Sequence, residues 1–395
     1  MNLMQPKIIN TEEEFRDLCE HIRSEQLVGF DTEFVSDRTY RPELGLLQFA
    51  TRDRAVVVDP LVVTSLKDWW QIMADEETTV VVHGGQAEIR FCLQQLGRPP
   101  QRLFDIQVAE GFRSCSYPLS YSAIVRRIVN RSVDGSQTRT DWTRRPLSEA
   151  QLKYALEDVE HLIDIYETQS DWLKQQGRLL WAKREVSRLI TDICSDESAD
   201  PWERLPGIHK LSRRDLAVLQ RLAQWREAEA CRKNRPVRRI LRDDLLVDLA
   251  RRQPNTEKQA LATRDLNRRE YRQHMQEVVD VITAAQKIRD RELPQRRRSR
   301  REEASSEEQV VARLLALALS NRCGELNVAY TLVANNRDLL ELVRFHRLGE
   351  RNDQTPRMLQ GWRAEMFGDL LRDVMDGKVS FRVAPRGSSA PLVFE

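Results

Sequence analysis

The sequence has 395 residues, of which 41% are hydrophobic and 31% charged, and its mean hydropathy is −0.57. These values predict a soluble globular protein of two or three domains and exclude a membrane protein, because no apolar run approaches about 20 residues. The first residues, MNLMQPKIIN, lack the basic and apolar regions of a secretory signal, which predicts a cytoplasmic location. The six cysteines have no CxxC spacing, which argues against a zinc site and against a disulfide framework.

The net charge of +2 hides an asymmetry along the chain. Residues 1–200 contain 24 basic and 33 acidic residues, a net charge of −9, whereas residues 207–290 contain 20 basic and 12 acidic residues, a net charge of +8. This asymmetry suggests a metal-dependent catalytic domain beside a domain that binds a polyanion. The alternative is that the charges only solvate helical faces.

The first 200 residues are predicted to form a mixed sheet covered by helices, class α/β. Thr11 and Glu14 form a capping box that begins the first helix. Short apolar runs separated by polar turns predict strands, and apolar residues at helical spacing predict the remaining helices. The expected strands span 28–34, 44–50, 55–60, 79–83 and 103–105, the first three as an antiparallel meander, and the expected helices span 65–73, 88–96, 106–112 and 120–128, with a last one from about 148.

Two carboxylates, Asp31 and Glu33, stand at alternate positions of the first predicted strand. Side chains two apart in a strand point the same way, so these acids would lie side by side and repel each other unless a cation lies between them. Oxygen ligands of this kind suit Mg²⁺ or Mn²⁺. The alternative is an edge strand with a solvated acidic face.

Tyr154 and Asp158 lie four residues apart on the last predicted helix, so both project from one helical face. The alternative is that Tyr154 packs in the core and Asp158 is solvated. Their place in the chain favours a catalytic pair, because they follow the acidic strand, an apolar strand with Glu88 just beyond it, and Asp105.

These motifs, in this order, resemble the ribonuclease D-like 3′-to-5′ exonucleases of the DEDD class, in the branch whose last motif carries tyrosine. The matching stretches cover most of the first 200 residues and read FDTEFVSDRTYRPELGLLQFA, VVVHGGQAEIRFC with LFDIQVAEGF, and SQTRTDWTRRPLSEAQLKYALEDVEHL. The resemblance implies an RNase H-like fold with two divalent cations. It implies metal binding and catalysis by Asp31, Glu33 and Asp158, with Tyr154 orienting the attacking water.

The chain departs from the family pattern at two positions. Glu88 stands where the family has aspartate, and Gly135 stands where many members have lysine. A longer carboxylate can still reach a metal directly or through water, so Glu88 is expected to join the metal-binding and catalytic set. Catalysis is sensitive to a misplacement of about 1 Å, so the activity follows less directly from the sequence than the fold does.

The second half of the chain is predicted to be all-helical. Residues 195–206 read as a linker. The stretch LSRRDLAVLQRLAQWREAEACRKNRPVRRILRDDLLVDLA within 207–290 resembles the small helical HRDC module of ribonuclease D and RecQ-type helicases. Its arginines are candidates for contacts with RNA phosphates; the alternative is a helical scaffold that packs on the exonuclease. These residues are Arg213, Arg214, Arg232, Arg235, Arg238 and Arg239.

Residues 305–378 resume helical periodicity and are predicted to form a second small HRDC-like domain, while residues 1–200 form the exonuclease domain. Residues 291–304, with a basic run at 296–301, read as a linker, and residues 379–395 as an extended or disordered tail without an assigned function.

The sequence therefore predicts a Mg²⁺- or Mn²⁺-dependent 3′-to-5′ exoribonuclease that trims the 3′ ends of structured RNA, with tRNA precursors as candidate substrates. No membrane partner and no nucleotide cofactor are expected, and protein partners cannot be predicted. One alternative is an exonuclease fold weakened at Glu88 and Gly135 that acts as an RNA-binding or interaction protein. Another is a 3′-to-5′ DNA exonuclease, because no residue in the sequence identifies a reader of the 2′-hydroxyl.

Overall fold

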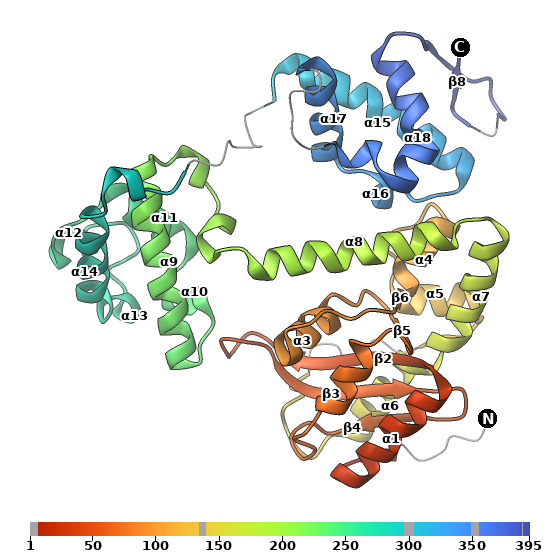
Figure 1. Cartoon of the computed structure of the whole chain (residues 1–395), viewed down its shortest axis with the longest axis horizontal. Coiled ribbons are helices and arrows are strands. Elements are labelled where there is room, and N and C mark those ends of the chain that lie inside the picture. The colour runs from red at the N-terminus through yellow and green to blue at the C-terminus, as the bar shows by residue number, and fades with distance from the viewer. Residues whose placement is uncertain (1–6, 134–139, 296–303, 349–354, 389) are drawn as a thin grey trace.

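The computed structural model describes residues 7–133, 140–295, 304–348, 355–388 and 390–395. Its first part is a mixed sheet covered by helices, and two helical regions follow (Figure 1). The predicted α/β class of the first part and helical class of the second are confirmed. Gly135 and the basic run at 296–301 lie outside the described residues.

The sheet region, residues 7–198, contains six strands in the order β1-β4-β3-β2-β5-β6. The neighbours β2, β3 and β4 pair antiparallel, which confirms the predicted meander, whereas β1, β5 and β6 pair parallel to their neighbours. The strands are β1 Lys7–Ile9, β2 Leu27–Val35, β3 Glu43–Ala50, β4 Ala55–Val58, β5 Thr79–Val82 and β6 Leu103–Asp105.

Successive residues of β2 face opposite sides of the sheet. Phe30 packs against Trp69 and Trp70 of α2 (Lys67–Met73), with ring centroids 4.5 and 6.1 Å apart. Gly29 points to the other face, where a Cβ added to it would lie 2.9 Å from the Leu162 Cβ of α7 (Leu162–Gln175). One face of the sheet at β2 is therefore covered by α2 and the other by α7, and successive β2 side chains point to these two faces in turn.

The helices of the sheet region extend further than the sequence predicted. Two helices, α7 and α8, follow the helix that begins near Ser148. The long helix α8 has 20 residues, about 30 Å, and runs from beside α4 and α7 toward the helices of residues 201–293 (Figure 1). Besides α2, the helices are α1 Glu12–Glu25, α3 Gln86–Leu96, α4 Ile106–Arg113, α5 Tyr121–Ile128, α6 Glu149–Glu160, α7 Leu162–Gln175 and α8 Leu179–Ser198.

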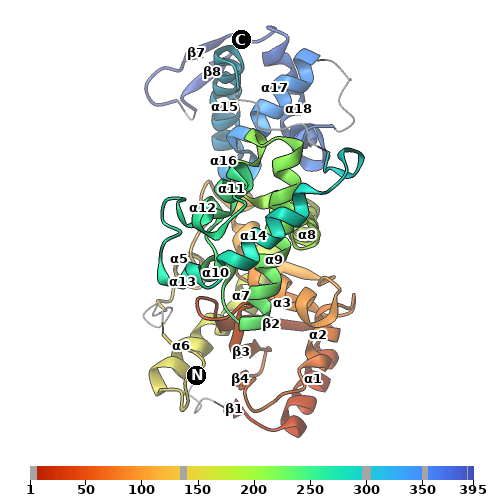
Figure 2. The same ribbon diagram turned by 90° about the vertical axis from the view of Figure 1, so that its left-hand side faces the viewer.

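The middle helical region, residues 201–293, has a hydrophobic core of its own. The segment predicted as a linker, residues 195–206, begins inside α8, and its Trp202 and Leu205 are buried in this core. Figure 2 shows α9 and α14 in front of α8. The helices are α9 Arg213–Lys233, α10 Val237–Ile240, α11 Asp243–Arg252, α12 Glu257–Leu261, α13 Arg269–Arg272 and α14 Met275–Gln286, with 3-10 turns at Pro201–Arg204, Ile208–Lys210 and Asp290–Glu292.

The C-terminal region, residues 304–395, shares one hydrophobic cluster with the sheet region. Its tail, expected to be extended or disordered, forms a two-stranded antiparallel hairpin. None of the helices in the described ranges is long and apolar enough to cross a membrane. The elements are α15 Ser306–Leu326, α16 Tyr330–Val333, α17 Asn336–Leu348, a 3-10 turn at Arg357–Leu359, α18 Gly361–Met375, β7 Phe381–Val383 and β8 Leu392–Phe394.

A buried ion-pair network fastens the C-terminal region to α8. Glu185 of α8 accepts hydrogen bonds from both terminal nitrogens of Arg363, at 2.7 and 2.9 Å, and from the Trp362 indole at 3.0 Å. Burial opposes ionisation of Glu185, but the hydrogen bonds and charges of Arg363 and Arg188 prevail and lower its pKa to about 2. This carboxylate is therefore ionised and fully paired.

Candidate active site

Strand β2 presents Asp31 and Glu33 on the α7 face of the sheet. These residues lie two and four positions after Gly29, which contacts α7. β2 pairs with β5 only through Leu27–Gly29, whereas β3 still pairs with both Asp31 and Glu33. The two carboxylates therefore lie beyond the end of β5, at a place that helices from both faces can reach.

Helix α6 brings Tyr154 and Asp158 to the same place. The helix begins with a capping box in which Ser148 and Gln151 satisfy each other's backbone N–H groups, and it packs across β2, β3 and β4. The Tyr154 hydroxyl is hydrogen-bonded to the Asp158 carboxylate. The Trp142 ring packs against the Tyr154 ring, with centroids 6.0 Å apart.

Glu88 reaches the site from the first turn of α3, on the other face of the sheet. Glu88 is only 4% exposed, and its carboxylate accepts a hydrogen bond of 2.6 Å from the Thr32 hydroxyl. Thr32 lies between the two acids of β2 and points toward α3. The sequence analysis missed this residue, although strand alternation alone places it on the opposite face from Asp31.

Burial and neighbouring acidic charges raise the pKa values of all four carboxylates. Burial and then the charges of Glu88, Asp158 and Glu33 raise the pKa of Asp31 well above its usual value. Burial and then the charges of Asp158 and Glu88 raise the pKa of Glu33 to about 8. Burial is also the main cause that raises the pKa values of Glu88 and Asp158, both to about 7. The acids thus resist ionising together without a compensating cation.

This donor set fits divalent cations. Asp31, Glu33, Glu88 and Asp158 offer carboxylate oxygens, which are the ligands that Mg²⁺ and Mn²⁺ prefer. The described structure pairs none of them with a lysine or arginine. Cations would offset the cost of holding these charges in a partly buried site and the repulsion that Asp31 and Glu33 experience, so the electrostatics and the ligand chemistry agree.

Two further residues shape the site. Asp105 begins α4 and accepts hydrogen bonds from the backbone N–H groups of Gly84 and Gly85, at 3.0 and 3.2 Å, which fixes the turn before α3. Burial and then the charges of Asp158 and Asp31 raise the pKa of Tyr121 well above its usual value. The sequence gives no signal for Tyr121, because only the fold brings α5 against the acids.

A second cluster of possible metal ligands lies in the middle helical region. Ligand atoms of Glu229, His274 and Glu277 lie within 4.8 Å of one another. Cationic side chains already engage this cluster: Arg232 and Lys233 contact Glu229 at 2.7 and 2.8 Å. The cluster therefore reads as an ion-pair network that joins α9 to α14.

The six arginines predicted to contact RNA fall into two groups. Four of them bind protein groups: two hold backbone carbonyls of residues 286–294, and two pair with Glu229 and Asp243. Arg235 and Arg239 are exposed and have no side-chain partner within the described ranges. The four engaged residues are Arg213, Arg214, Arg232 and Arg238.

The turn between β2 and β3 joins these arginines to the site. The Tyr40 hydroxyl donates a hydrogen bond of 2.9 Å to Glu227 of α9, and the Tyr40 backbone N–H donates one of 3.2 Å to the Asn234 side chain. Arg38 of the same turn pairs with Asp141, at 2.7 Å, in the loop before α6. The end of α9 therefore lies beside the strand that carries the first two acids.

Comparison with known proteins agrees with this arrangement. A family model for 3′-5′ exonucleases matches residues 6–171, and a model for the HRDC domain matches residues 215–282. Ribonuclease D of Gluconacetobacter diazotrophicus is 33% identical over 95% of this chain and 94% of its own length. Ribonuclease D of Zymomonas mobilis is 31% identical over 96% of both chains.

Solved structures give the same result. The crystal structure of Escherichia coli RNase D, described as an exoribonuclease involved in structured RNA processing, superposes with a TM-score of 0.82 at 26% identity over 95% of this chain and 99% of that one. An exonuclease fold of this type implies dependence on divalent metal ions. The resemblance drawn from the motifs is confirmed, and the chain belongs to the ribonuclease D family of 3′-5′ exoribonucleases.

Proposed function

We propose that this exoribonuclease trims the 3′ ends of structured RNA, tRNA precursors included, by two-metal hydrolysis of the terminal phosphodiester. The observation that carries the proposal is the convergence of four carboxylates with raised pKa values from β2, α3 and α6, of which Glu88 is buried and the other three are partly buried. The similar E. coli enzyme acts in structured RNA processing, which supports this substrate class.

Asp31, Glu33, Glu88 and Asp158 would hold two divalent cations, Mg²⁺ or Mn²⁺. Such ions activate a water and stabilise the attacking and leaving oxygens of an in-line displacement at phosphorus. The partial burial of the carboxylates lowers the local dielectric constant, which strengthens the charge interactions at the site.

Tyr154 orients the attacking water in this proposal. Its hydroxyl lies against Asp158, and Trp142 packs on its ring, so the phenol is held from two sides. A hydroxyl fixed by packing and by one hydrogen bond can direct a water without first reorganising.

Glu88 replaces the shorter acid of the family without leaving the site. The Thr32 hydroxyl holds its carboxylate at 2.6 Å, and burial leaves the side chain little freedom. The extra methylene is thus absorbed within the packed side chain rather than projected into solvent.

The exposed Arg235 and Arg239 would contact phosphates of the RNA body. Arg235 follows α9 closely and Arg239 lies in α10, while the end of α9 contacts the β2–β3 turn through Asn234. Contacts of this kind position the substrate without reading its sequence.

A time course on matched RNA and DNA, labelled at either end, tests the proposal. With Mg²⁺ or Mn²⁺ the enzyme should shorten 5′-labelled RNA one nucleotide at a time, release the label of 3′-labelled RNA at once, and stop in EDTA. Turnover that persists in EDTA, or degradation from the 5′ end, would contradict it. DNA cleaved as fast as RNA would favour the DNA exonuclease, and binding without turnover would favour the weakened fold.

A further inference from the structure

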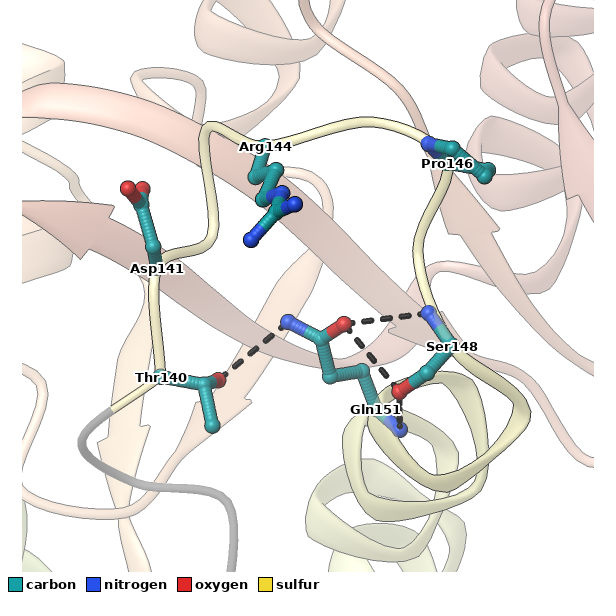
Figure 3. Close-up of a pocket in the computed structure, with 6 residues that line it drawn as sticks. All are labelled: Thr140, Asp141, Arg144, Pro146, Ser148 and Gln151. Atoms are coloured by element: carbon teal, nitrogen blue, oxygen red, sulfur yellow. Dashed lines mark hydrogen bonds between the residues drawn. The ribbon is translucent and has the colours of Figure 1, made fainter.

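A pocket of about 260 Å³ lies beside the proposed metal site, between the loop at 140–146 and the start of α6 (Figure 3). It is distinct from the four acids, because its floor residue Gln151 lies two turns before Asp158, about 10 Å along the helix. The lining residues are Thr140, Asp141, Arg144, Pro146, Ser148 and Gln151.

Arg144 lies over this pocket with unused hydrogen-bond donors. Figure 3 shows its side chain extending into the space between Asp141 and Pro146. The next residue, Arg145, makes a bidentate pair with Asp59 at 2.6 and 2.7 Å, whereas the Arg144 guanidinium has no partner within the described part of the chain. A free guanidinium fork matches the oxygens of a phosphate.

Asp141 gives the pocket a fixed hydrogen-bond acceptor. Its carboxylate accepts from the Arg38 guanidinium at 2.7 Å and from the Thr143 hydroxyl and N–H at 2.7 and 3.2 Å. The hydrogen bonds from Thr143 and then Arg38 lower the pKa of Asp141 to about 2, so the group stays ionised at neutral pH. Three of about four acceptor positions are filled, which leaves room for one donor from a ligand.

The other polar side chains that line the pocket already make hydrogen bonds within the protein. The Gln151 amide donates to the Thr140 hydroxyl at 3.2 Å and accepts from the Ser148 N–H at 3.0 Å (Figure 3). No aromatic ring lines the pocket, so it offers no platform on which a base can stack. A ligand would thus be recognised through an anionic group at Arg144 and a donor at Asp141.

A ribonucleotide presents this pair of groups in its sugar–phosphate backbone. We propose that the pocket binds the ribose and phosphate of a nucleotide upstream of the 3′-terminal residue, with Arg144 on the phosphate and Asp141 on the 2′-hydroxyl. The 2′-hydroxyl distinguishes RNA from DNA, so this subsite would make the enzyme prefer RNA without reading its sequence. The inference rests on the proposed function, because it places the substrate strand along α6.

Substrate length tests the role of Arg144. Dissociation constants in EDTA, and KM and kcat with Mg²⁺, are compared for an RNA dinucleotide and an RNA decamer. Arg144→Gln should weaken decamer binding at least about tenfold, mainly in KM, with a smaller loss for the dinucleotide. The matched control Arg16→Gln removes the same charge from the exposed face of α1 and should change neither value. An equal loss for both lengths, or none, would overturn the assignment.

Single 2′-deoxy substitutions test the role of Asp141. A set of decamers carries one deoxynucleotide each, at a different position in each decamer. The decamer substituted at one upstream position should bind the wild-type protein severalfold more weakly than the all-RNA decamer does. That penalty should vanish in Asp141→Ala and persist in Arg38→Gln, which removes the ion pair but keeps the acceptor. If no position carries a penalty, or if both variants retain it, the subsite is refuted. Failure of the proposed function would look different: the wild type would bind RNA in EDTA but show no metal-dependent hydrolysis.

Discussion

Buried and partly buried carboxylates in two regions of this molecule have opposite pKa shifts. At the junction of α8 with the C-terminal region, Glu185 meets Arg363 and Arg188, and its pKa falls to about 2 although burial opposes this. On the part of β2 that extends beyond β5, burial and then repulsion by Asp158 and Glu88 raise the pKa of Glu33 to about 8. A carboxylate that the protein itself neutralises serves structure, whereas carboxylates that it leaves in repulsion require an external cation.

The two helical regions show the same contrast in how they join the sheet region. The C-terminal region shares its hydrophobic cluster and its buried ion pair with α8. The middle helical region has a separate core and contacts the sheet region through the polar Tyr40 turn. We therefore expect the C-terminal region to stabilise the catalytic body, and the middle region to present its free arginines to the substrate. The domain boundaries predicted from the sequence, at 1–200, 207–290 and 305–378, stay predictions.

The largest expected effect is the loss of activity on substitution of Asp31. Asp31→Asn should lower kcat at least about 1,000-fold, because it removes a charged ligand from the proposed metal site. The same substitution removes a repelled charge, so the metal-free protein should be no less stable and should keep its RNA affinity. Rates are measured at saturating Mg²⁺, and near-wild-type turnover would contradict the assignment.

Substitutions at Glu88 separate a ligand role from a packing role. Glu88→Ala should cost about 100-fold in activity or more, whereas Glu88→Asp should cost less than about tenfold, because aspartate keeps the carboxylate and only shortens it. Thr32→Val removes the hydroxyl donor without changing the side-chain volume much, and it should cost severalfold. If the Glu88→Asp variant is instead severalfold faster than the wild type, the longer glutamate side chain of the wild type misplaces a cation.

Substitution of the ion-paired Glu185 should lower the stability of the protein. Glu185→Gln should lower the free energy of unfolding by about 3–5 kcal/mol, because it leaves the buried Arg363 without its counter-charge. Urea denaturation measures this loss. Glu365, an exposed partner of Trp181 and Arg184, provides the control: Glu365→Gln should change the stability by less than about 1 kcal/mol. Similar effects for the two substitutions would remove the distinction between the sites.

A smaller effect concerns the pH dependence of the metal-free protein. Folding raises the pKa values of the site acids, to about 8 for Glu33 and about 7 for Glu88 and Asp158. The folded state then holds more protons than the unfolded chain between about pH 4.5 and 8, so stability should fall as pH rises through this window. We expect Tm in EDTA to drop by several degrees from pH 5 to pH 8, and Mn²⁺ to remove much of the drop. A Tm that rises over this range would refute the electrostatic account.

Local patterns could predict the part of the site that lies on single elements. Alternation placed Asp31 and Glu33 on one face of β2, and the four-residue spacing placed Tyr154 and Asp158 on one face of α6. Sequence could not reveal contacts between distant elements: Glu185 and Arg363 are 178 positions apart. Trp202, in a stretch rich in polar residues, looked like part of a linker because its burial depends entirely on the helices that fold around it.

Calorimetric titration of the metal-free protein with Mn²⁺, repeated in buffers of different ionisation enthalpy, tests the central claim most directly. We predict two Mn²⁺ ions bound per wild-type chain at pH 7 with net release of protons, because the raised pKa values of the four acids leave some of them protonated before metal arrives. Asp31→Asn should lose most of this binding. Absence of binding, or binding without proton release, would contradict the claim that these four carboxylates form the metal site.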